Sequence, residues 1–256
     1  MSRILVTGAA GALGAAVVRR LLRDPDFEAR VSDSRPLPQW IREGAAVHAG
    51  DLREEAETAL RGCTRAIVLG DDAPPFTALE RRVALLRAAA AAGLERVTFV
   101  DAGDAPLVAA HAEHGLPFTV CRTAGVYGPG LEGLVGTLLA ASRARAPLPA
   151  DADVVAAALY LDDAADAIVA ATAAAETAGG TFAVSAGAPL RELAELCWAA
   201  CGHAAEELVL EPPVEPVEEV PHAAALERAL DWRPRVGVRE GIARTLASLD
   251  HFPGGH

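Results

Sequence analysis

The sequence contains no lysine, and all 23 of its basic residues are arginine. Chemistry that depends on a lysine ammonium is therefore excluded. Arginine does not replace lysine in this chemistry. The pKa of a guanidinium is too high for the protein to shift it to a useful value, and the planar guanidinium has a different geometry from an ammonium group. Alanine is heavily used as well, so a general drift in composition from lysine to arginine also explains the absence.

Positive charge is scarce along the whole chain. The formal net charge is −12, and the arginines form no cluster. Such a chain repels nucleic acids and anionic membranes, so we expect neither as a partner. No apolar run is long enough to span a bilayer, and Met1–Arg3 leads directly into a predicted strand with no signal peptide. We therefore expect a cytoplasmic protein.

Cysteine is scarce too, with four residues and no spacing typical of a disulfide framework. We expect all four thiols, at positions 63, 121, 197 and 201, to stay reduced. Cys197 and Cys201 lie four residues apart with His203 nearby, which is compatible with part of a metal site. A fourth ligand is missing, and small buried thiols are common on helices, so we predict no bound metal.

The chain does contain a glycine-rich turn near its start. The apolar run Arg3–Val6 leads into residues 7–14, TGAAGALG, and the amphipathic segment 15–22 follows. The first glycine permits a tight turn, the second lets the backbone approach a pyrophosphate, and the third lets the helix pack close to the strand. Free amides and the helix dipole then face the phosphates of a dinucleotide. A strand-to-helix turn without a ligand is the structural alternative. The predicted cofactor loop consists of Gly8, Gly11, Ala12, Leu13 and Gly14.

A carboxylate ends the second predicted strand. Asp33 lies 19 residues after Gly14, where an acidic side chain accepts hydrogen bonds from the adenosine ribose hydroxyls. A 2′-phosphate would meet like charge there, so NAD is favoured over NADP. Arg35, two residues further on, softens that preference, and we assign both residues to the cofactor site.

Periods of two and of 3.6 residues alternate along the chain. The alternation predicts an α/β fold with a Rossmann-type doubly wound parallel sheet in residues 1–130. Residues 131–256 are expected to form mainly a small α/β substrate lobe, interleaved with that core, and the proline-rich segment 211–221 to be extended. The expected strands are 3–6, 27–33, 45–49, 66–70, 96–100, 117–122, 154–161 and 181–185. The expected helices are 15–22, 53–61, 76–92, 106–114, 131–144, 163–175, 189–201, 222–230 and 237–249.

Ligands bind at the carboxyl edge of such a sheet. The residues that follow the predicted strands at this edge therefore complete the expected cofactor site. Asp51 also has a structural explanation, as the N-cap of the helix 53–61. The additional cofactor residues are Asp51, Leu52, Leu69, Gly70 and Arg122.

Four motifs follow the glycine-rich turn in order. They are GDL at 50–52, CRTAGVYGPG at 121–130, YLDDAADA at 160–167 and LDWRPRV at 230–236. With residues 7–14, they resemble an extended short-chain dehydrogenase/reductase of the NAD-dependent epimerase/dehydratase type over nearly the whole chain. The resemblance implies a Rossmann fold, NAD and a small organic or sugar-like substrate. A helix dipole accounts equally well for the acidic start of the third motif.

The chain departs from that family in its catalytic residues. Family members use a Ser or Thr after the fifth strand and a Tyr-x-x-x-Lys pair on the next helix, where the lysine lowers the pKa of the tyrosine. Neither Tyr127 nor Tyr160, the only two tyrosines, has a basic residue four positions later. Only 13 residues separate Val100 from His114, so the segment that would carry the pair is deleted. We therefore expect an atypical member.

Three residues remain as catalytic candidates. Asp101, at the end of the fifth strand, is the first choice as acid or base if burial raises its pKa. His111 has a side chain suited to the same role and shares a helix face with His114. Exposure on a surface helix is the alternative for both histidines. Tyr127 offers a phenol, although the resemblance makes it a shaping residue first.

Three functions remain open from the sequence. One is an NAD-dependent enzyme doing isomerase, dehydratase, cyclase or redox chemistry on a small molecule, which the retained lobe after Leu131 favours. The others are an inactive NAD-binding regulator and a cleft recruited for a different ligand. A homodimer through the helices that bracket the site is weakened by the shortness of the helix 106–114.

Overall fold

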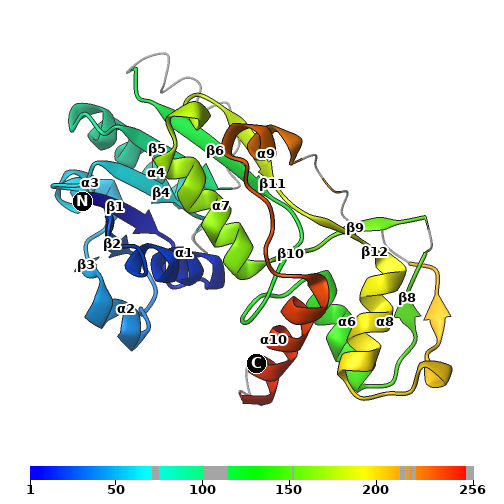
Figure 1. The fold of residues 1–256 in the computed structure, drawn as a ribbon. Coiled ribbons are helices and arrows are strands. Elements are labelled where there is room, and N and C mark those ends of the chain that lie inside the picture. Colours follow the sequence, from blue (N-terminus) through cyan, green and yellow to red (C-terminus); the bar gives the residue numbers. More distant parts are fainter. Residues whose placement is uncertain are drawn as a thin grey trace. The chain divides into compact units, whose positions relative to one another are not determined.

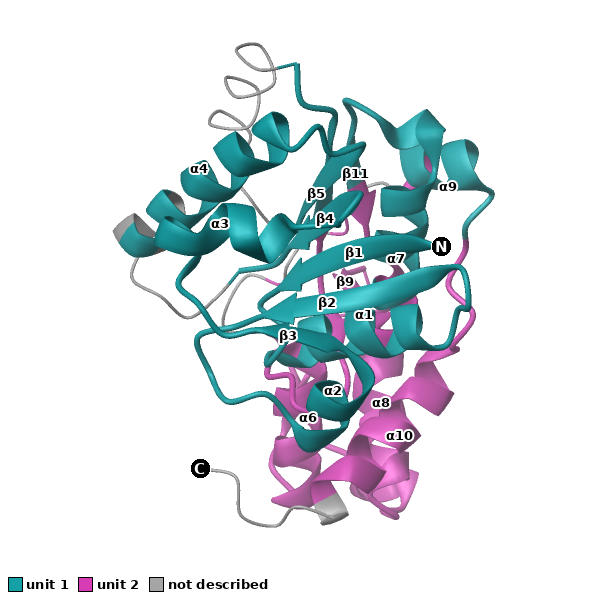
Figure 2. Cartoon of the chain, turned by 90° about the vertical axis from the view of Figure 1, so that its left-hand side faces the viewer, with its two compact units in different colours: residues 1–122, 165–182, 225–232 teal, residues 123–164, 183–224, 233–256 magenta. Residues whose placement is uncertain are grey.

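The chain folds into two compact units in a computed structural model (Figure 1). The structure describes residues 1–70, 75–100, 115–151, 153–213, 217, 220 and 223–251. Unit 1 comprises residues 1–122, 165–182 and 225–232, and unit 2 comprises residues 123–164, 183–224 and 233–256 (Figure 2). Each unit is therefore assembled from three separate segments of the sequence.

Unit 1 is built around a seven-stranded sheet with the order β3-β2-β1-β4-β5-β6-β11. All pairs from β3 to β6 are parallel, which confirms the predicted Rossmann-type sheet. The chain extends the sheet from β1 to β3 first and then continues on the other side of β1 with β4. The carboxyl ends of β1 and β4 therefore form the switch point at which such sheets bind ligands. The strands are β1 (Ser2–Thr7), β2 (Phe27–Ser32), β3 (Ala46–His48), β4 (Arg65–Val68), β5 (Arg96–Val100), β6 (Phe118–Thr123) and β11 (Thr181–Val184).

Helices cover both faces of this sheet (Figure 2). On one face, α3 (Leu52–Leu60) and α4 (Pro75–Ala91) pack on the strands in an apolar cluster that includes Phe99. On the other face, α1 (Ala12–Leu22) and α7 (Leu161–Ala173) are joined by an ion pair of 2.7 Å between Arg20 and Asp166. The short helix α2 (Gln39–Gly44) was not expected from the sequence, and it buries only Ile41. No helix in the described ranges has the length and apolar character needed to cross a membrane.

Unit 2 contains a second apolar cluster, formed by three helices and small paired strands. The helices are α6 (Leu134–Arg143), α8 (Leu190–Ala200) and α10 (Val238–His251). The strand pairs are β10 (Leu159–Tyr160) with β7 (Val126–Tyr127), β12 (Gly187–Pro189) with β9 (Val155–Ala157), and β13 (Leu210–Glu211) with β8 (Leu148–Pro149). The remaining element of unit 2 is the 3-10 turn η2 (Ala205–Glu207), whereas the 3-10 turn η1 (Ala175–Thr177) and nearly all of α9 (Ala224–Leu230) belong to unit 1.

The expected single strand 154–161 was wrong in one respect, because the structure divides it at Ala158. β9 pairs antiparallel with β12, whereas β10 pairs parallel with β7. The backbone N–H of Ala158 still bonds Ala186, and the next N–H, of Leu159, already bonds Gly125. The chain therefore changes partner between these two residues, which an apolar run in the sequence does not reveal.

Candidate functional site

The glycine-rich turn connects β1 to α1 at the switch point of the sheet. Gly8 has φ +69°, a conformation that favours glycine, and a Cβ there would lie 2.8 Å from the carbonyl oxygen of Gly70. A Cβ on Gly14 would overlap the backbone of Gly8. These two glycines therefore bring the first turn of α1 against the ends of β1 and β4, as the sequence predicted.

Gly11 has a different role, because its backbone is extended and any residue can adopt its conformation. Its Cβ position is 3.2 Å from Nη2 of Arg35, a flexible side chain, so the fold itself tolerates a larger residue here. Among the residues that the structure describes, no side chain caps α1. The first-turn amides, including those of Ala12 and Leu13, therefore point with the positive end of the helix dipole toward the space in front of Gly11.

Asp33 follows β2 and faces the same turn. Its carboxylate accepts hydrogen bonds of 2.8 Å from the backbone N–H groups of Ala10 and Arg35, and Nε of Arg35 lies 3.3 Å away. The side chain of Asp33 has no exposed surface. Burial alone would raise the pKa of Asp33, but the hydrogen bonds and the Arg35 charge outweigh it and lower this pKa below its usual value. Asp33 is therefore ionised at neutral pH.

A cavity of about 230 Å³ opens beside the turn at the ends of β1, β2 and β3. Asp51 lies on its wall and accepts a hydrogen bond of 3.0 Å from the backbone N–H of Arg53, as a helix N-cap does. The side-chain hydrogen bond from Arg53 is the main cause that lowers the pKa of Asp51 to about 2. The cavity is lined by Thr7, Gly8, Ser32, Asp33, Ser34, Ala49, Gly50, Asp51, Leu52 and Arg81.

The structure thus brings four predicted cofactor residues to one cavity: Gly8, Asp33, Asp51 and Leu52. Leu69 and Gly70 lie against Gly8, just outside this lining. Arg122 is exposed near the end of β6 and does not line the cavity.

The sequence analysis missed Arg81, a cavity residue on α4 that lies 3.5 Å from the Asp51 carboxylate. Its helical position was predictable. Nothing in the sequence distinguishes it from the adjacent Arg82, because the direction of its side chain depends on how α4 packs against α3.

Two of the three catalytic candidates, Asp101 and His111, lie outside the described residues, as does His114. The third, Tyr127, is 4% exposed and packs edge-to-face on Tyr160. Its hydroxyl donates to the carbonyl of Val238 at 3.4 Å, and burial raises the pKa of Tyr127 well above its usual value. This environment favours a shaping role for Tyr127 over proton transfer.

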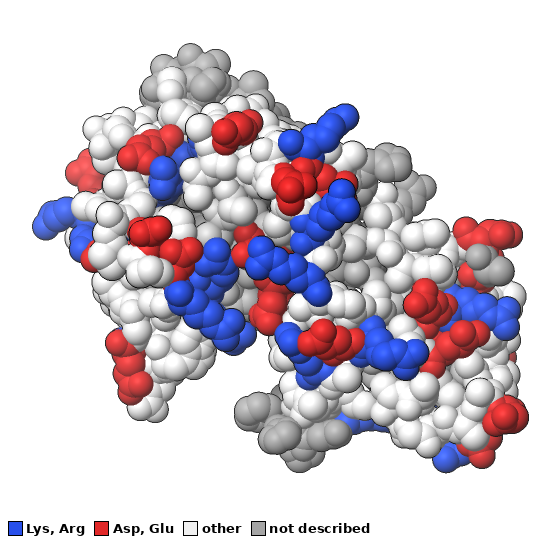
Figure 3. Space-filling model, viewed as in Figure 1, with Lys and Arg blue, Asp and Glu red and all other residues white. Residues whose placement is uncertain are grey.

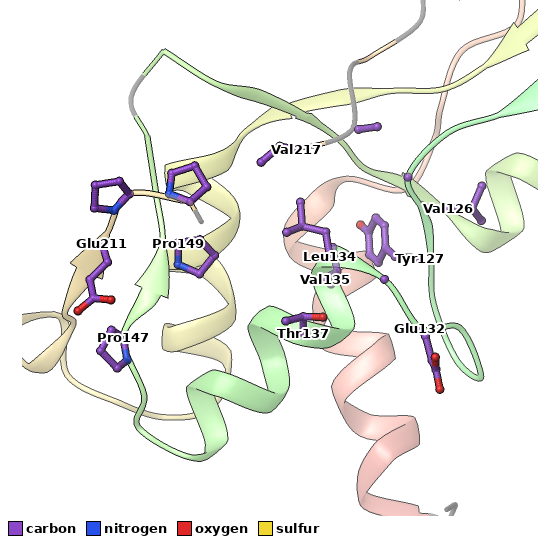
Figure 4. A pocket seen from close by; sticks show the side chains of 15 residues that line it. Val126, Tyr127, Glu132, Leu134, Val135, Thr137, Pro147, Pro149, Glu211 and Val217 are labelled. Atoms are coloured by element: carbon purple, nitrogen blue, oxygen red, sulfur yellow. The ribbon is translucent and has the colours of Figure 1, made fainter. Parts of the chain in front are cut away.

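Unit 2 holds a larger cavity, of about 680 Å³. Figure 4 shows Tyr127, Leu134 and Val135 on one side of it, and Pro147, Pro149 and Glu211 on the other. The walls come from β7, from the first turn of α6, and from the segments around β8 and β13. The sequence analysis expected a substrate lobe here, but it did not identify these residues as neighbours.

The cysteine of α8, Cys197, is explained by packing. Burial raises the pKa of the Cys197 thiol to about 12, so this group is a protonated, apolar part of the core. The ring of His203 packs on Trp198, and its Nε2 lies 2.9 Å from the carbonyl of Ser142. In the part of the chain that the structure describes, no three His, Cys, Asp or Glu side chains are grouped as metal ligands.

Charged side chains of both signs are interspersed over the face shown in Figure 3. Many arginines are used in surface ion pairs, such as Arg3 with Glu28 and Arg191 with Glu195. This distribution offers no broad basic surface on that face for a polyanion.

No protein-family model matches the sequence, and no curated protein is similar to it at a significant level. Solved structures do match. A UDP-glucose 4-epimerase from Thermotoga maritima, solved with UDP-glucose, is similar with a TM-score of 0.79 and 20% identity, over 98% of this chain and 100% of that chain. A UDP-glucose 4-epimerase from Thermus thermophilus, in complex with NAD, has a TM-score of 0.75 and 24% identity, over 99% and 100% of the two chains.

A dTDP-glucose 4,6-dehydratase from Bacillus anthracis, also in complex with NAD, has a TM-score of 0.82 and 17% identity. This match covers 98% of this chain and 97% of that chain. At such identities the similarity establishes the fold, and the chain therefore shares the Rossmann-type α/β fold of these epimerases and dehydratases.

Proposed function

We propose that this chain is an enzyme that binds NAD in unit 1 and converts a small organic molecule. The observation that supports it most is the glycine-rich turn at the switch point, because two glycines there are required by close backbone contacts and the third leaves space before an uncapped helix N-terminus. That arrangement is suited to a pyrophosphate.

The residues around the turn fit the rest of the cofactor. The amides of Ala12 and Leu13 would hold the pyrophosphate, and Asp33 would accept the ribose hydroxyls, with the cavity beside Asp51 left for the adenine. Arg35 covers Asp33 from one side, so its partly exposed side chain has to swing aside when the ribose binds. When bound, NAD supplies a hydride acceptor.

NAD is preferred to NADP in this proposal because of the charge on Asp33. A 2′-phosphate would lie beside an ionised carboxylate that already uses the nearest cation, Arg35, as its partner. The repulsion between these two negative charges opposes the binding of NADP.

An enzyme is favoured over a purely regulatory protein by the cavity of unit 2. Its volume of about 680 Å³ is typical of small-molecule sites, and a regulator that only senses NAD does not require it. The structural neighbours are epimerases and dehydratases, which supports chemistry of that general kind. Without lysine, the proton transfers must use other groups, and Asp101 and His111 remain the predicted ones.

Calorimetric titration of the purified chain with NAD, NADH, NADP and NADPH tests the proposal. We expect NAD or NADH to bind at least about tenfold more tightly than the phosphorylated forms. Gly11→Val should abolish this binding without unfolding the chain, because its side chain fills the pyrophosphate space. Gly237→Val is the matched control, since the space around Gly237 is open. Failure of all four nucleotides to bind the wild type would refute the proposal.

A further inference from the structure

We propose that the cavity of unit 2 accepts an uncharged, mainly apolar small molecule and rejects ligands that carry phosphate. This inference deepens the proposed function, on which it rests, by naming the class of substrate. It separates this chain from the epimerase of Thermotoga maritima, which was solved with UDP-glucose.

The first argument is charge. Among the described residues that line the cavity, none is basic, whereas Glu132 and Glu211 are acidic. Neither carboxylate has an ion-pair partner within the described part of the chain. Residues 211–213 and 217 contribute to the lining, the sequence 211–221 contains no arginine, and the chain has no lysine. A diphosphate would therefore enter this cavity without a counter-charge from its walls.

The second argument is the character of the walls. Between the two carboxylates, most of the lining residues are apolar, such as Leu134, Val135 and Pro149, with the hydroxyl of Thr137 among them (Figure 4). An anion that is moved from water to such a surface loses its hydration without compensation, which is costly. The uncapped first turn of α6, after Gly133, offers amide donors for a carbonyl or hydroxyl oxygen of the ligand. The two acidic residues of the lining, Glu132 and Glu211, oppose a phosphate at this turn by like charge.

A cationic ligand is less suitable than an uncharged one. Figure 4 shows the carboxylates of Glu132 and Glu211 at opposite ends of the lining, and both residues are exposed. An ammonium group near Leu134 would lose water without a direct partner. At either end, it would form only a solvent-screened pair, which contributes little to binding.

The third argument is rigidity. Four prolines line the cavity, at 147, 149, 212 and 213, and the pairing of β8 with β13 holds the two segments together. Proline has a fixed φ, so little backbone entropy is lost when a ligand binds between these rings. A rigid, largely apolar ring system is therefore a suitable occupant.

Three probes with one scaffold test the proposal: 2-naphthol, which is uncharged at pH 7, 2-naphthyl phosphate and 2-(aminomethyl)naphthalene. Each is titrated by calorimetry into the full chain in the presence of excess NAD, which occupies the proposed phosphate site of unit 1, with UDP as a fourth ligand. We expect 2-naphthol to bind and the phosphate and UDP to bind at least about tenfold more weakly. Equal or tighter binding of either phosphate ligand would overturn the inference, and so would an amine that binds tenfold more tightly than the naphthol.

Variants locate the binding in this cavity. Thr137, an exposed residue of the lining on α6, is replaced by arginine, with Thr137→Met as the uncharged control of similar length. Thr137→Arg should increase the affinity for 2-naphthyl phosphate by about tenfold, and Thr137→Met should not. Leu134→Asn should weaken the binding of 2-naphthol. Unchanged binding of both probes in these variants would show that they bind elsewhere and contradict the inference.

The NAD titration on the same preparation separates the two proposals. If the wild type does not bind NAD but binds 2-naphthol in the cavity, the proposed function is contradicted and the ligand class of the cavity is not. Binding of NAD together with a preference for phosphate-bearing probes would contradict only the assignment of the substrate class.

Discussion

The carboxylate of Asp33 accepts a hydrogen bond of 2.8 Å from the backbone N–H of Ala10. This bond ties the end of β2 to the turn that follows β1, across 23 residues of sequence. The acid expected to bind ribose and the turn expected to bind phosphate are therefore parts of one hydrogen-bonded structure. Preorganisation of this kind lowers the entropic cost of binding.

Asp33 should make stability depend on pH in the acid range. Its pKa in the folded chain is below the unfolded value of 3.8, so its contribution is complete above about pH 4 and is lost as the pH falls through the folded pKa. We expect Asp33→Asn to lower the free energy of unfolding by about 1–3 kcal/mol at pH 7, because the hydrogen bonds to the ionised carboxylate are replaced by weaker ones to a neutral amide. Urea unfolding at pH 7 and pH 3 measures the effect.

The control for this prediction is Asp26→Asn, at an exposed carboxylate just before β2. The unfolding free energies of wild type and Asp33→Asn should converge as the pH falls, and the control should keep the pH dependence of the wild type. A constant difference between wild type and Asp33→Asn at both pH values would contradict the assignment.

Arg35 should control the ratio of NAD to NADP affinity. It pairs with Asp33 at 3.3 Å and must move when ribose binds, so Arg35→Ser removes an interaction that competes with the cofactor. A partly exposed pair contributes about 0–1 kcal/mol, and we expect NAD to bind up to about fivefold more tightly. NADP loses a cation near its 2′-phosphate and should bind more weakly. Calorimetry on both nucleotides gives the ratio, and a fall in the ratio would show that Arg35 contacts NAD directly.

Substitutions at Gly14 and at Gly11 should have different effects: the first on the stability of the fold, the second on the binding of NAD. A methyl group at Gly14 overlaps the backbone of Gly8, and we expect Gly14→Ala to lower the unfolding free energy by about 1–3 kcal/mol. A methyl group at Gly11 meets the flexible side chain of Arg35 and, at an ordinary contact distance of 3.5 Å, the carbonyl oxygen of Gly8, so Gly11→Ala should change stability by about 0.5 kcal/mol or less while weakening NAD binding. Denaturant titration and calorimetry compare the pair. Equal loss of stability in both variants would contradict this division of roles.

The parts of the fold that depend on local pattern were predictable from the sequence. β5 has the predicted bounds, and the turn at residues 7–14 was assigned from the glycine spacing between a predicted strand and a predicted helix. Both follow from interactions between residues close in sequence, such as the tight turn at Gly8. Asp33 was placed from its distance to the turn, although its bond to Ala10 was not foreseen.

The parts that depend on distant pairing were not predictable. The cavity of unit 2 forms because Leu148 pairs with Leu210, which brings the prolines after β13 next to those around β8. The sequence indicated an extended proline-rich segment but not its neighbour. The division of the predicted strand 154–161 at Ala158 has the same origin. A change of strand partner does not alter the periodicity of hydrophobic residues in the sequence.

Asp163 should hold the segment at Arg235 and Val236 to the start of α7, in addition to interacting with the helix dipole. Its buried carboxylate accepts hydrogen bonds from the backbone N–H groups of Arg235 at 3.1 Å and Val236 at 2.9 Å. Asp163→Ala leaves both donors without their acceptor, at a cost of about 1–3 kcal/mol each. The matched control is Asp162→Ala, in the same helical turn but more exposed, which should cost about 1 kcal/mol or less. Urea unfolding measures the loss of stability in both variants. Equal losses would show that Asp163 stabilises the chain only through its interaction with the helix dipole.

Tyr127 should not ionise in the folded chain near pH 10. Burial raises its pKa above the unfolded value of 10.0, so its stabilising contribution is complete below about pH 10 and is lost as the pH rises through the folded pKa. Near-ultraviolet titration of wild type and Tyr127→Phe isolates this phenol, because the chain has only two tyrosines. We expect the difference curve to stay flat until the chain unfolds. Tyr127→Phe should change stability by about 1 kcal/mol or less, since the hydrogen bond from Tyr127 to Val238 is long. A transition near pH 10 in the difference curve would show an accessible phenol and restore Tyr127 as a candidate for proton transfer.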